Sequence, residues 1–356
     1  MNTQILTTPQ GETYPIKVGS GLLNSIGDAL AAQTAPCRVM LVSDSNVAPL
    51  YMEQVKKSLE SAGFIVNTHT VSAGEQSKSI AVLGTLLESF AESHLTRTDL
   101  AVALGGGVIG DLTGFAAGCY LRGIRFIQLP TTLLAAVDAS VGGKTAVNLA
   151  HGKNLAGLFH QPIGVYCDVD TMQTLSPHEM ADGAAEAIKT GILGDSSLFS
   201  IYESGNPLAQ LEEIISRSVA YKSKIVMEDP EEHSVRKLLN LGHTPAHAIE
   251  RLSNFSISHG HAVAIGMAIV TRAAVKRGIM DSDESTRILQ TIKRNNLPIC
   301  CPYTAKEMAE IAMLDKKAAA SDITIILPEK IGACRMEKMP LTALESLFAD
   351  GLEEQA

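Results

Sequence analysis

Apolar and polar positions follow two different rhythms along the chain. In the first half, short apolar runs are bounded by turn-forming residues, and we predict a strand at each of them, over 37–44, 64–71, 99–104, 124–130 and 164–169. Amphipathic stretches between the early runs predict helices over 48–63 and 79–94. Strands that alternate with helices indicate a mostly parallel sheet with helices on both faces, which is a Rossmann-like arrangement.

The rhythm changes after about Pro177. Apolar residues then recur at helical spacing, and we predict helices over 177–195, 211–229, 244–253, 260–278 and 284–296. Strand patterns return at 321–339. We therefore expect an α/β domain over 1–176 and a mainly α-helical domain over 177–356. Ligands of open α/β sheets bind outside the carboxyl ends of the strands, so we expect the active site in the cleft between the two domains.

The composition narrows the class of protein and its partners. Hydrophobic residues make up 46% of the chain and aromatic residues 4%, so an aliphatic core is expected. The net charge of −9 argues against nucleic acid as a partner, because a phosphate backbone requires a basic face. No signal-peptide pattern and no apolar stretch of about 18 residues occur, so we expect a cytoplasmic protein with no membrane partner. The six cysteines form no CxxC pair, which argues against a cysteine-type zinc or redox motif.

A glycine-rich stretch follows the apolar run 99–104. Gly105, Gly107 and Gly110 have the GxGxxG spacing of a dinucleotide-binding turn between a strand and a helix. Glycine lets the backbone approach a pyrophosphate, and a helix N-terminus favours an anion. Asp44, after the strand over 37–43, is our candidate for the ribose contact. A tight turn that needs small residues explains the same glycines without a ligand.

The sequence GGKT at 142–145 ends like a phosphate-binding P-loop. Such a loop requires a glycine five residues before the second glycine, but Asp138 holds that position here. A carboxylate there would repel a phosphate, so the P-loop interpretation is disfavoured. Lys144 therefore needs another ligand.

Several cations lie among small or apolar residues, which is unusual for charges on a solvated surface. They are Arg122, Lys144, Lys153, Lys189, Lys222 and Arg236. Lys144 and Lys153 flank a Gly/Asn-rich stretch that we interpret as a loop. Cations in such places favour a phosphate or carboxylate substrate held by charge-assisted hydrogen bonds. For Lys222, a solvated helix face also explains the charge.

Histidines at 243, 247, 259 and 261 are candidates for a metal site. His243 and His247 have the i, i+4 spacing of HExxH, but no Glu follows His243. Thr244 also fits a helix N-cap with Pro245 at the first helical position. We therefore expect His243 to precede the helix that contains His247.

His259 lies in the sequence SHGH, which we interpret as a loop before the next helix. Two loop histidines ahead of two helices can converge on one ion, and a carboxylate would complete three ligands with an open position for substrate. Glu186 is the candidate, because it lies in an Ala-rich helix that otherwise carries little charge, with Lys189 one turn on. Hydrogen-bonded structural histidines are the alternative for each of these positions.

Taken together, these stretches resemble the 3-dehydroquinate synthase family over roughly residues 14–335. The matching segments include GGGVIGDLTGF, GGKTAVN, GKNLAGLFHQP, GAAEAIK, LNLGHTPAHAIE and HGHAVAIGM. Members of this family convert 3-deoxy-D-arabino-heptulosonate 7-phosphate to 3-dehydroquinate and phosphate. The resemblance implies transient oxidation by NAD, elimination of phosphate, re-reduction and an intramolecular aldol closure, with one divalent metal ion, Zn²⁺ or Co²⁺.

The resemblance also implies a role for each matching residue. The implied metal ligands are Glu186, His243 and His259. The implied NAD contacts are Asp44, Asn46, Glu75, Lys78, Gly106, Gly107, Val108, Asp111, Thr131, Thr132, Lys144, Lys153, Thr171 and Thr174. The implied substrate contacts are Arg122, Asp138, Lys144, Asn154, Lys189, Lys222, Arg236, Asn240 and Lys317, with Lys316 as the alternative to Lys317. The implied catalytic residues are Lys144, Lys189, Lys222 and the acid–base pair Glu232 and His247.

The chain departs from the family pattern at two places near the histidines. Ala246 replaces a usual Gly, and His261 replaces a usual Glu, so His261 stands beside His259 as a candidate ligand. Three other functions are consistent with parts of this sequence. They are a related cyclase acting on another sugar phosphate, an NAD- and metal-dependent polyol dehydrogenase, and a non-catalytic binding module. We further expect a homodimer that acts on a small anionic sugar phosphate.

Overall fold

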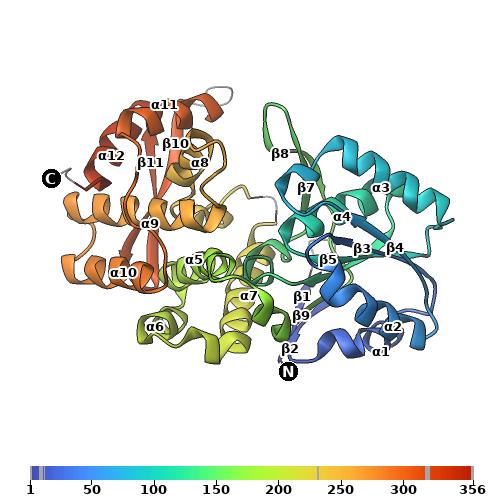
Figure 1. The fold of residues 1–356 in the computed structure, drawn as a ribbon. Coiled ribbons are helices and arrows are strands. Elements are labelled where there is room, and N and C mark those ends of the chain that lie inside the picture. The colour runs from blue at the N-terminus through green and yellow to red at the C-terminus, as the bar shows by residue number, and fades with distance from the viewer. Residues whose placement is uncertain (1, 8–10, 12, 231, 317–320, 354–356) are drawn as a thin grey trace. The chain divides into compact units, whose positions relative to one another are not determined.

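The computed structural model describes residues 2–7, 11, 13–230, 232–316 and 321–353. The chain divides into two compact units, Met1–Leu175 and Ser176–Ala356 (Figure 1). The strands are β1 (Asn2–Thr7), β2 (Thr13–Gly19), β3 (Arg38–Asp44), β4 (Ile65–Val71), β5 (Leu100–Gly105), β6 (Arg125–Pro130), β7 (Lys144–Leu149), β8 (Gly152–Phe159), β9 (Val165–Asp168), β10 (Asp322–Lys330) and β11 (Ala333–Pro340).

The helices complete both units. They are α1 (Ile26–Ala31), α2 (Glu53–Ser61), α3 (Ile80–Glu92), α4 (Gly107–Cys119), α5 (Pro177–Gly194), α6 (Ser196–Ser204), α7 (Leu211–Glu228), α8 (His243–Leu252), α9 (His259–Lys276), α10 (Ser282–Arg294), α11 (Ala305–Lys316) and α12 (Leu344–Gly351). No helix in the described part of the chain has both the length and the apolar composition needed to cross a membrane.

A parallel sheet forms the centre of the first unit. Its strand order is β1-β2-β9-β6-β5-β3-β4; β1 pairs antiparallel with β2, and the other neighbours run parallel. Alternate residues of β3 face opposite sides of the sheet. Met40 and Val42 pack toward α3 and α4, whereas Val39 and Leu41 pack toward α1 and α2. The predicted mostly parallel sheet with helices on both faces is thus confirmed (Figure 1).

The strand order contains a switch point between β3 and β5. The chain leaves β3 to form β4 on one side and then returns to form β5 on the other side of β3. Connections that diverge in this way leave a crevice at the carboxyl ends of the two strands, which is where doubly wound sheets bind nucleotides. Asp44 ends β3 and Gly105 ends β5, so both lie at this crevice.

The stretch between Lys144 and Lys153 is not the loop that the sequence predicts. It forms an antiparallel hairpin of β7 and β8, with Thr145 paired to Leu158. The hairpin joins the unit where the Asn148 N–H donates to the Lys78 carbonyl oxygen at 2.8 Å. The alternation of small and apolar side chains was too weak a signal against the glycines at either end.

The second unit is mainly helical, as predicted. Helix α9 is buried on almost all sides and lies against α5, α8 and α12 (Figure 1). The late strand pattern forms the β10–β11 hairpin, in which Ile325 pairs with Glu337.

The starts of α8 and α9 differ from the prediction. His243 is the first residue of α8, and Gly242, not Thr244, is its N-cap. Gly242 has a φ of 75°, a left-handed conformation that glycine adopts without strain, and the N-cap lies two residues earlier than predicted. His259 likewise is the first residue of α9, after the N-cap Ser258. Both histidines thus belong to first helical turns, not to loops.

Candidate functional site

Glu186, His243 and His259 converge in the second unit. Glu186 lies on α5, and the two histidines begin α8 and α9. The Nε2 atom of His243 lies 3.7 Å from Glu186 Oε1, and Nε2 of His259 lies 3.5 Å from the same oxygen. The three residues offer ligand atoms within 4.8 Å of one another. The structure therefore brings together the three predicted metal ligands.

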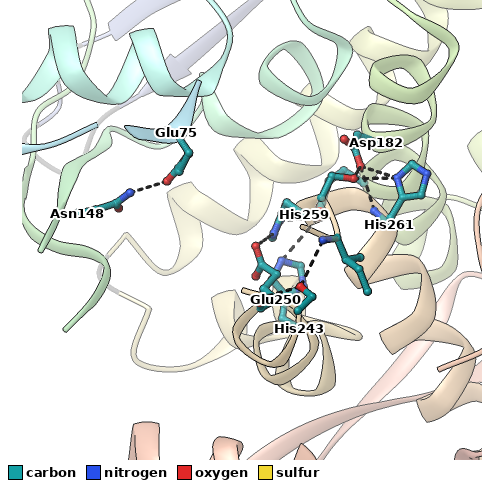
Figure 2. A network of polar contacts seen from close by, with 11 residues as sticks. Glu75, Asn148, Asp182, His243, Glu250, His259 and His261 are labelled. Atoms are coloured by element: carbon teal, nitrogen blue, oxygen red, sulfur yellow. Dashed lines mark hydrogen bonds and ion pairs between the residues drawn. The ribbon is translucent and has the colours of Figure 1, made fainter. Parts of the chain in front are cut away.

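In both His243 and His259, the Nδ1 atom faces an oxygen acceptor outside the cluster (Figure 2). Nδ1 of His243 lies 3.1 Å from the Leu241 carbonyl oxygen, and Nδ1 of His259 lies 3.6 Å from Glu250 Oε1. A carbonyl oxygen only accepts, so Nδ1 of His243 carries the proton and its Nε2 presents a lone pair toward Glu186. A lone pair that faces a carboxylate is a favourable place for a cation, and this donor set fits a zinc-type ion.

The carboxyl group of Glu186 is buried, and neighbouring charges decide whether it is ionised. Glu186 is 1% exposed, and its oxygens accept no well-formed hydrogen bond from the described residues. Burial opposes the ionisation of Glu186, but its ion pair with Lys189 and the two histidines hold the pKa well below its ordinary value. Glu186 is therefore a carboxylate, as a metal ligand must be.

The pKa values of the two histidines shift in opposite directions. Burial, followed by the charge of Lys189, lowers the pKa of His243, which is neutral. Burial also opposes the charge of His259, but Glu186 and Glu250 outweigh it and raise the pKa of His259 to about 10. Without a metal ion, His259 thus carries the positive charge between two carboxylates, in the place where a divalent ion would lie.

His247 and His261 lie outside this cluster. His247 is exposed on α8, and its ring centroid lies 5.6 Å from that of His243. His261 turns to Asp182, with Nδ1 2.8 Å from Asp182 Oδ1 (Figure 2). The structure thus places His259, and not His261, beside Glu186 and His243.

Three predicted substrate-binding cations are buried within the second unit. Lys189 and Arg236 are each 2% exposed, and Lys222 is 9% exposed. Lys222 is thus not on a solvated helix face, which removes the alternative explanation of its charge. Lysine and arginine are rarely buried unless an anion balances them. Glu186 balances Lys189 within the chain, and the substrate roles of Lys189, Lys222 and Arg236 stay predictions.

The segment after α7 carries two more of the predicted residues. Glu232 accepts a hydrogen bond from Asn240 Nδ2 at 2.8 Å, and it has a φ of 64°. A positive φ costs free energy in a residue other than glycine, so this conformation is held by its surroundings. Asp229 accepts hydrogen bonds from the N–H groups of Ser234 and Arg236 at 2.7 and 2.9 Å and fixes the segment.

In the first unit, the predicted NAD contacts share one edge of the sheet. Most of them follow the carboxyl end of a parallel strand. Asp44 and Asn46 follow β3, Glu75 and Lys78 follow β4, Gly106 to Val108 and Asp111 follow β5, Thr131 and Thr132 follow β6, and Thr171 and Thr174 follow β9. Carboxyl ends of parallel strands meet at one edge, so the fold gathers residues from five separate segments.

Contacts at this edge bind the segments to one another. Lys78 forms a buried ion pair with Asp111, and Glu75 accepts a hydrogen bond from Asn148 Nδ2 at 2.7 Å. The latter contact links the β7–β8 hairpin, which carries Lys144 and Lys153, to the turn after β4.

The glycine-rich turn at Gly105–Gly107 packs closely against the turn after β6. A side chain at Gly106 would meet Thr132 Cγ2 at 3.1 Å, so the turns after β5 and β6 touch here. Gly106 is also the N-cap of α4, whose free N–H groups point out of the first turn. The buried hydroxyl of Thr131 has no hydrogen-bond partner within the described part of the chain, which leaves a donor for a ligand.

The remaining predicted substrate contacts fall at scattered places. Arg122 and Lys144 are exposed, Asp138 is half-buried in the short π-helix Ala135–Ala139 after β6, and Asn154 is exposed on β8 with a φ of 58°. Lys317 lies outside the described residues. The roles of all these residues stay predictions.

Two carboxylates of this region were missed from the sequence. Glu250 lies seven residues after His243 on α8, which is a spacing that returns to the same helix face, and this periodicity was a usable signal. Asp182 lies one turn before Glu186 on α5. Its contact with α9 could not be read from its own helix.

Several solved structures have a fold similar to that of this chain. The chain matches a solved structure of 2-deoxy-scyllo-inosose synthase with carbaglucose-6-phosphate, NAD⁺ and Co²⁺ at TM-score 0.87 and 23% identity, over 99% of this chain and 100% of that one. It matches ValA, a 2-epi-5-epi-valiolone synthase from Streptomyces hygroscopicus subsp. jinggangensis 5008 with NAD⁺ and Zn²⁺, at TM-score 0.86 and 26% identity, over 94% and 96%. A glycerol dehydrogenase from Schizosaccharomyces pombe matches at TM-score 0.67 and 14% identity, over 98% and 90%.

The fold is therefore one that synthases and dehydrogenases share. Two family models then match the chain itself. Residues 68–182 match the 3-dehydroquinate synthase N-terminal model, and residues 183–318 match the 3-dehydroquinate synthase C-terminal model. The chain belongs to the 3-dehydroquinate synthase family of sugar-phosphate cyclases.

Proposed function

We propose that the chain is an NAD- and metal-dependent lyase that converts 3-deoxy-D-arabino-heptulosonate 7-phosphate to 3-dehydroquinate and phosphate. The observation that carries the proposal is the Glu186–His243–His259 cluster, in which a histidine lone pair faces a buried carboxylate. In a chain of this family, such a cluster supports one divalent ion, Zn²⁺ or Co²⁺. The homodimer and the cytoplasmic location stay predictions.

The bound NAD belongs at the switch point of the sheet. The crevice between β3 and β5 combines Asp44 for the ribose with the Gly106–Gly107 turn and the start of α4 for the pyrophosphate. When bound, NAD accepts and returns a hydride, and the divalent ion polarises the oxygen at the carbon that is oxidised.

The chain's own residues hold the anion and move protons. Lys189, Lys222 and Arg236 offer buried positive charge to the phosphate and carboxylate of the substrate. Phosphate elimination requires that a proton leaves the carbon next to the new ketone and that the negative charge on the departing phosphate is stabilised. We assign the proton transfers to the carboxylate of Glu232 and the imidazole of His247. The hydrogen bond from Asn240 orients the carboxylate of Glu232.

The first experiment measures phosphate release from the heptulosonate phosphate with catalytic NAD⁺ and Zn²⁺ while the absorbance of NADH is followed. We expect stoichiometric phosphate and no standing NADH, because the hydride returns within each turnover. Turnover that requires stoichiometric NAD⁺ would contradict the proposed internal redox cycle.

A related cyclase activity is the second candidate. The full-length structural matches to 2-deoxy-scyllo-inosose synthase and to the valiolone synthase favour it. The intact GGKT stretch and the family models that match favour the dehydroquinate product. Phosphate release from glucose 6-phosphate, or turnover of sedoheptulose 7-phosphate, in place of the heptulosonate would decide for the second candidate. Accumulation of NADH with glycerol would instead indicate a dehydrogenase.

A further inference from the structure

A second cluster of metal-ligand side chains lies beside the first. His178 and Asp182 are one turn apart on α5, and His261 is the third residue of α9. Their ligand atoms lie within 4.8 Å of one another. The proposed reaction uses none of these side chains.

The backbone fixes this meeting of α5 and α9. A side chain at Gly260 would lie 2.3 Å from the Asp182 carbonyl oxygen, so the two helices touch here through their backbones. Asp182 Oδ1 then accepts hydrogen bonds from Ser258 Oγ at 2.7 Å and from the N–H of His261 at 3.0 Å. The carboxylate is thereby held in place at the start of α9 (Figure 2).

The separations between the donor atoms lie on either side of the value expected around a zinc-type ion. Ligands about 2.0–2.1 Å from a tetrahedral ion lie about 3.3 Å from one another. Nδ1 of His261 lies 2.8 Å from Asp182 Oδ1, and Nδ1 of His178 lies 3.7 Å from Asp182 Oδ2. The two imidazole rings stack with their centroids 4.1 Å apart and an interplanar angle of 10°, and each ring has a nitrogen beside one carboxylate oxygen of Asp182.

A cavity of about 440 Å³ adjoins the cluster. His178 and His261 line it together with the hydroxyl of Ser258 and the thiols of Cys300 and Cys301. His178 is 59% exposed, which gives an ion a path from solvent. Two imidazoles and one carboxylate favour zinc-type ions over magnesium or calcium, and the cavity leaves room for a water or thiol as the fourth ligand.

We propose that His178, Asp182 and His261 form a second divalent-metal site, which takes a Zn²⁺-type ion and joins the start of α5 to the start of α9. The ion takes the place of the hydrogen bond between His261 Nδ1 and Asp182 Oδ1. The site is separate from the Glu186 cluster. Asp182 and Glu186 are one helical turn apart on α5, about 6 Å along its axis, and each takes a different histidine of α9.

The test is metal stoichiometry on the full chain. The protein is stripped with a chelator, dialysed against Zn²⁺ and analysed for bound metal. We expect two ions per chain in the wild type, one in His178→Ala and in His261→Gln, and one in Glu186→Gln. His94→Asn, which changes an exposed histidine whose φ of 55° an Asn tolerates, should retain two.

Thermal unfolding supplies a second readout that does not depend on activity. His178 is exposed, so His178→Ala should unfold at the wild-type temperature without metal and lose part of the increase that Zn²⁺ gives. One ion in the wild type, or two ions retained by the His178→Ala, His261→Gln double variant, would overturn the proposal. Because Glu186→Gln and His178→Ala remove different ions, failure of one site is distinguishable from failure of the other.

Discussion

Glu250 and His259 face one another beside Glu186, with Glu250 Oε1 3.6 Å from His259 Nδ1. The other ring nitrogen of His259 faces Glu186. Glu250 is 4% exposed, so solvent screens the interaction between its charge and the imidazole of His259 only weakly. It orients the imidazole and raises the basicity of the nitrogen that would bind the ion.

Substitution of Glu250 should therefore weaken metal binding without changing a ligand. We expect Glu250→Gln to lower the affinity of the Glu186 cluster for Zn²⁺ roughly 10-fold and Glu250→Ala up to about 100-fold. Competition with a chromophoric chelator measures both. Wild-type affinity in Glu250→Ala would show that the contact does not tune the ion.

The ion pair of Glu186 with Lys189 should dominate the stability of the metal-free chain. Glu186→Gln leaves the Lys189 charge buried and should lower the free energy of unfolding by about 3–5 kcal/mol. Adding Lys189→Met should restore most of that loss but not the ion of this cluster. Urea unfolding in chelator, together with metal analysis, separates the two effects. A metal-free Glu186→Gln chain as stable as the wild type would contradict the argument.

Asp229 should make stability depend on acid pH. Burial opposes its charge, but the backbone N–H groups of Arg236, Ser234 and His233 hold the pKa of its carboxyl well below the ordinary value. A lowered folded-state pKa means that this stabilisation is complete above the unfolded value of about 3.9 and is lost as pH falls below it.

We therefore expect Asp229→Asn to destabilise the chain at pH 7 and the difference from the wild type to shrink below about pH 4. Urea midpoints of both proteins across this range provide the measurement. A difference that stays constant from pH 7 to pH 3 would exclude the carboxylate as its source.

Asp44 has a structural role and a proposed ribose role that two variants can separate. Its Oδ1 accepts hydrogen bonds from the N–H groups of Asn46 and Val47 at 2.8 and 3.0 Å. Asn keeps these acceptors but loses the charge, so Asp44→Asn should fold normally and bind NAD about 10-fold more weakly or worse. Asp44→Ala should lose stability as well. Calorimetric titration with NAD⁺ tests this, and unchanged affinity in Asp44→Asn would remove Asp44 from the nucleotide site.

Lys144 is exposed at the start of β7, so its removal should leave the fold intact. We expect Lys144→Ala to abolish phosphate release, because the charge serves the substrate, while NAD⁺ still binds through its other predicted contacts. Lys57→Ala, which changes an exposed lysine on α2, is the matched control and should keep wild-type turnover. Retained activity in Lys144→Ala would remove its substrate role.

The periodicity of the chain was sufficient for most of the fold. Strand β5 and helices α5 and α7 lie close to where the spacing of apolar residues predicts them. Burial of one or two faces of an element requires apolar residues at regular spacing, and this spacing can be read from the local sequence. The β7–β8 hairpin was missed, because its pairing depends on contacts with the turn at Lys78. The N-cap of α8 was misplaced by two residues, because the left-handed conformation of Gly242 competes with the capping propensity of Thr244.

The sequence by itself determined the kinds of chemistry available to this protein. It supplied the glycine turn after β5, the buried cations, and a set of histidines and carboxylates with ligand chemistry. Only the tertiary structure decided which of these groups meet. His259 joins Glu186, whereas His261, two residues on, joins Asp182 and His178. The physical reason is that α9 touches the backbone of α5 at Gly260, and this contact, which no local pattern encodes, assigns each histidine to its carboxylate.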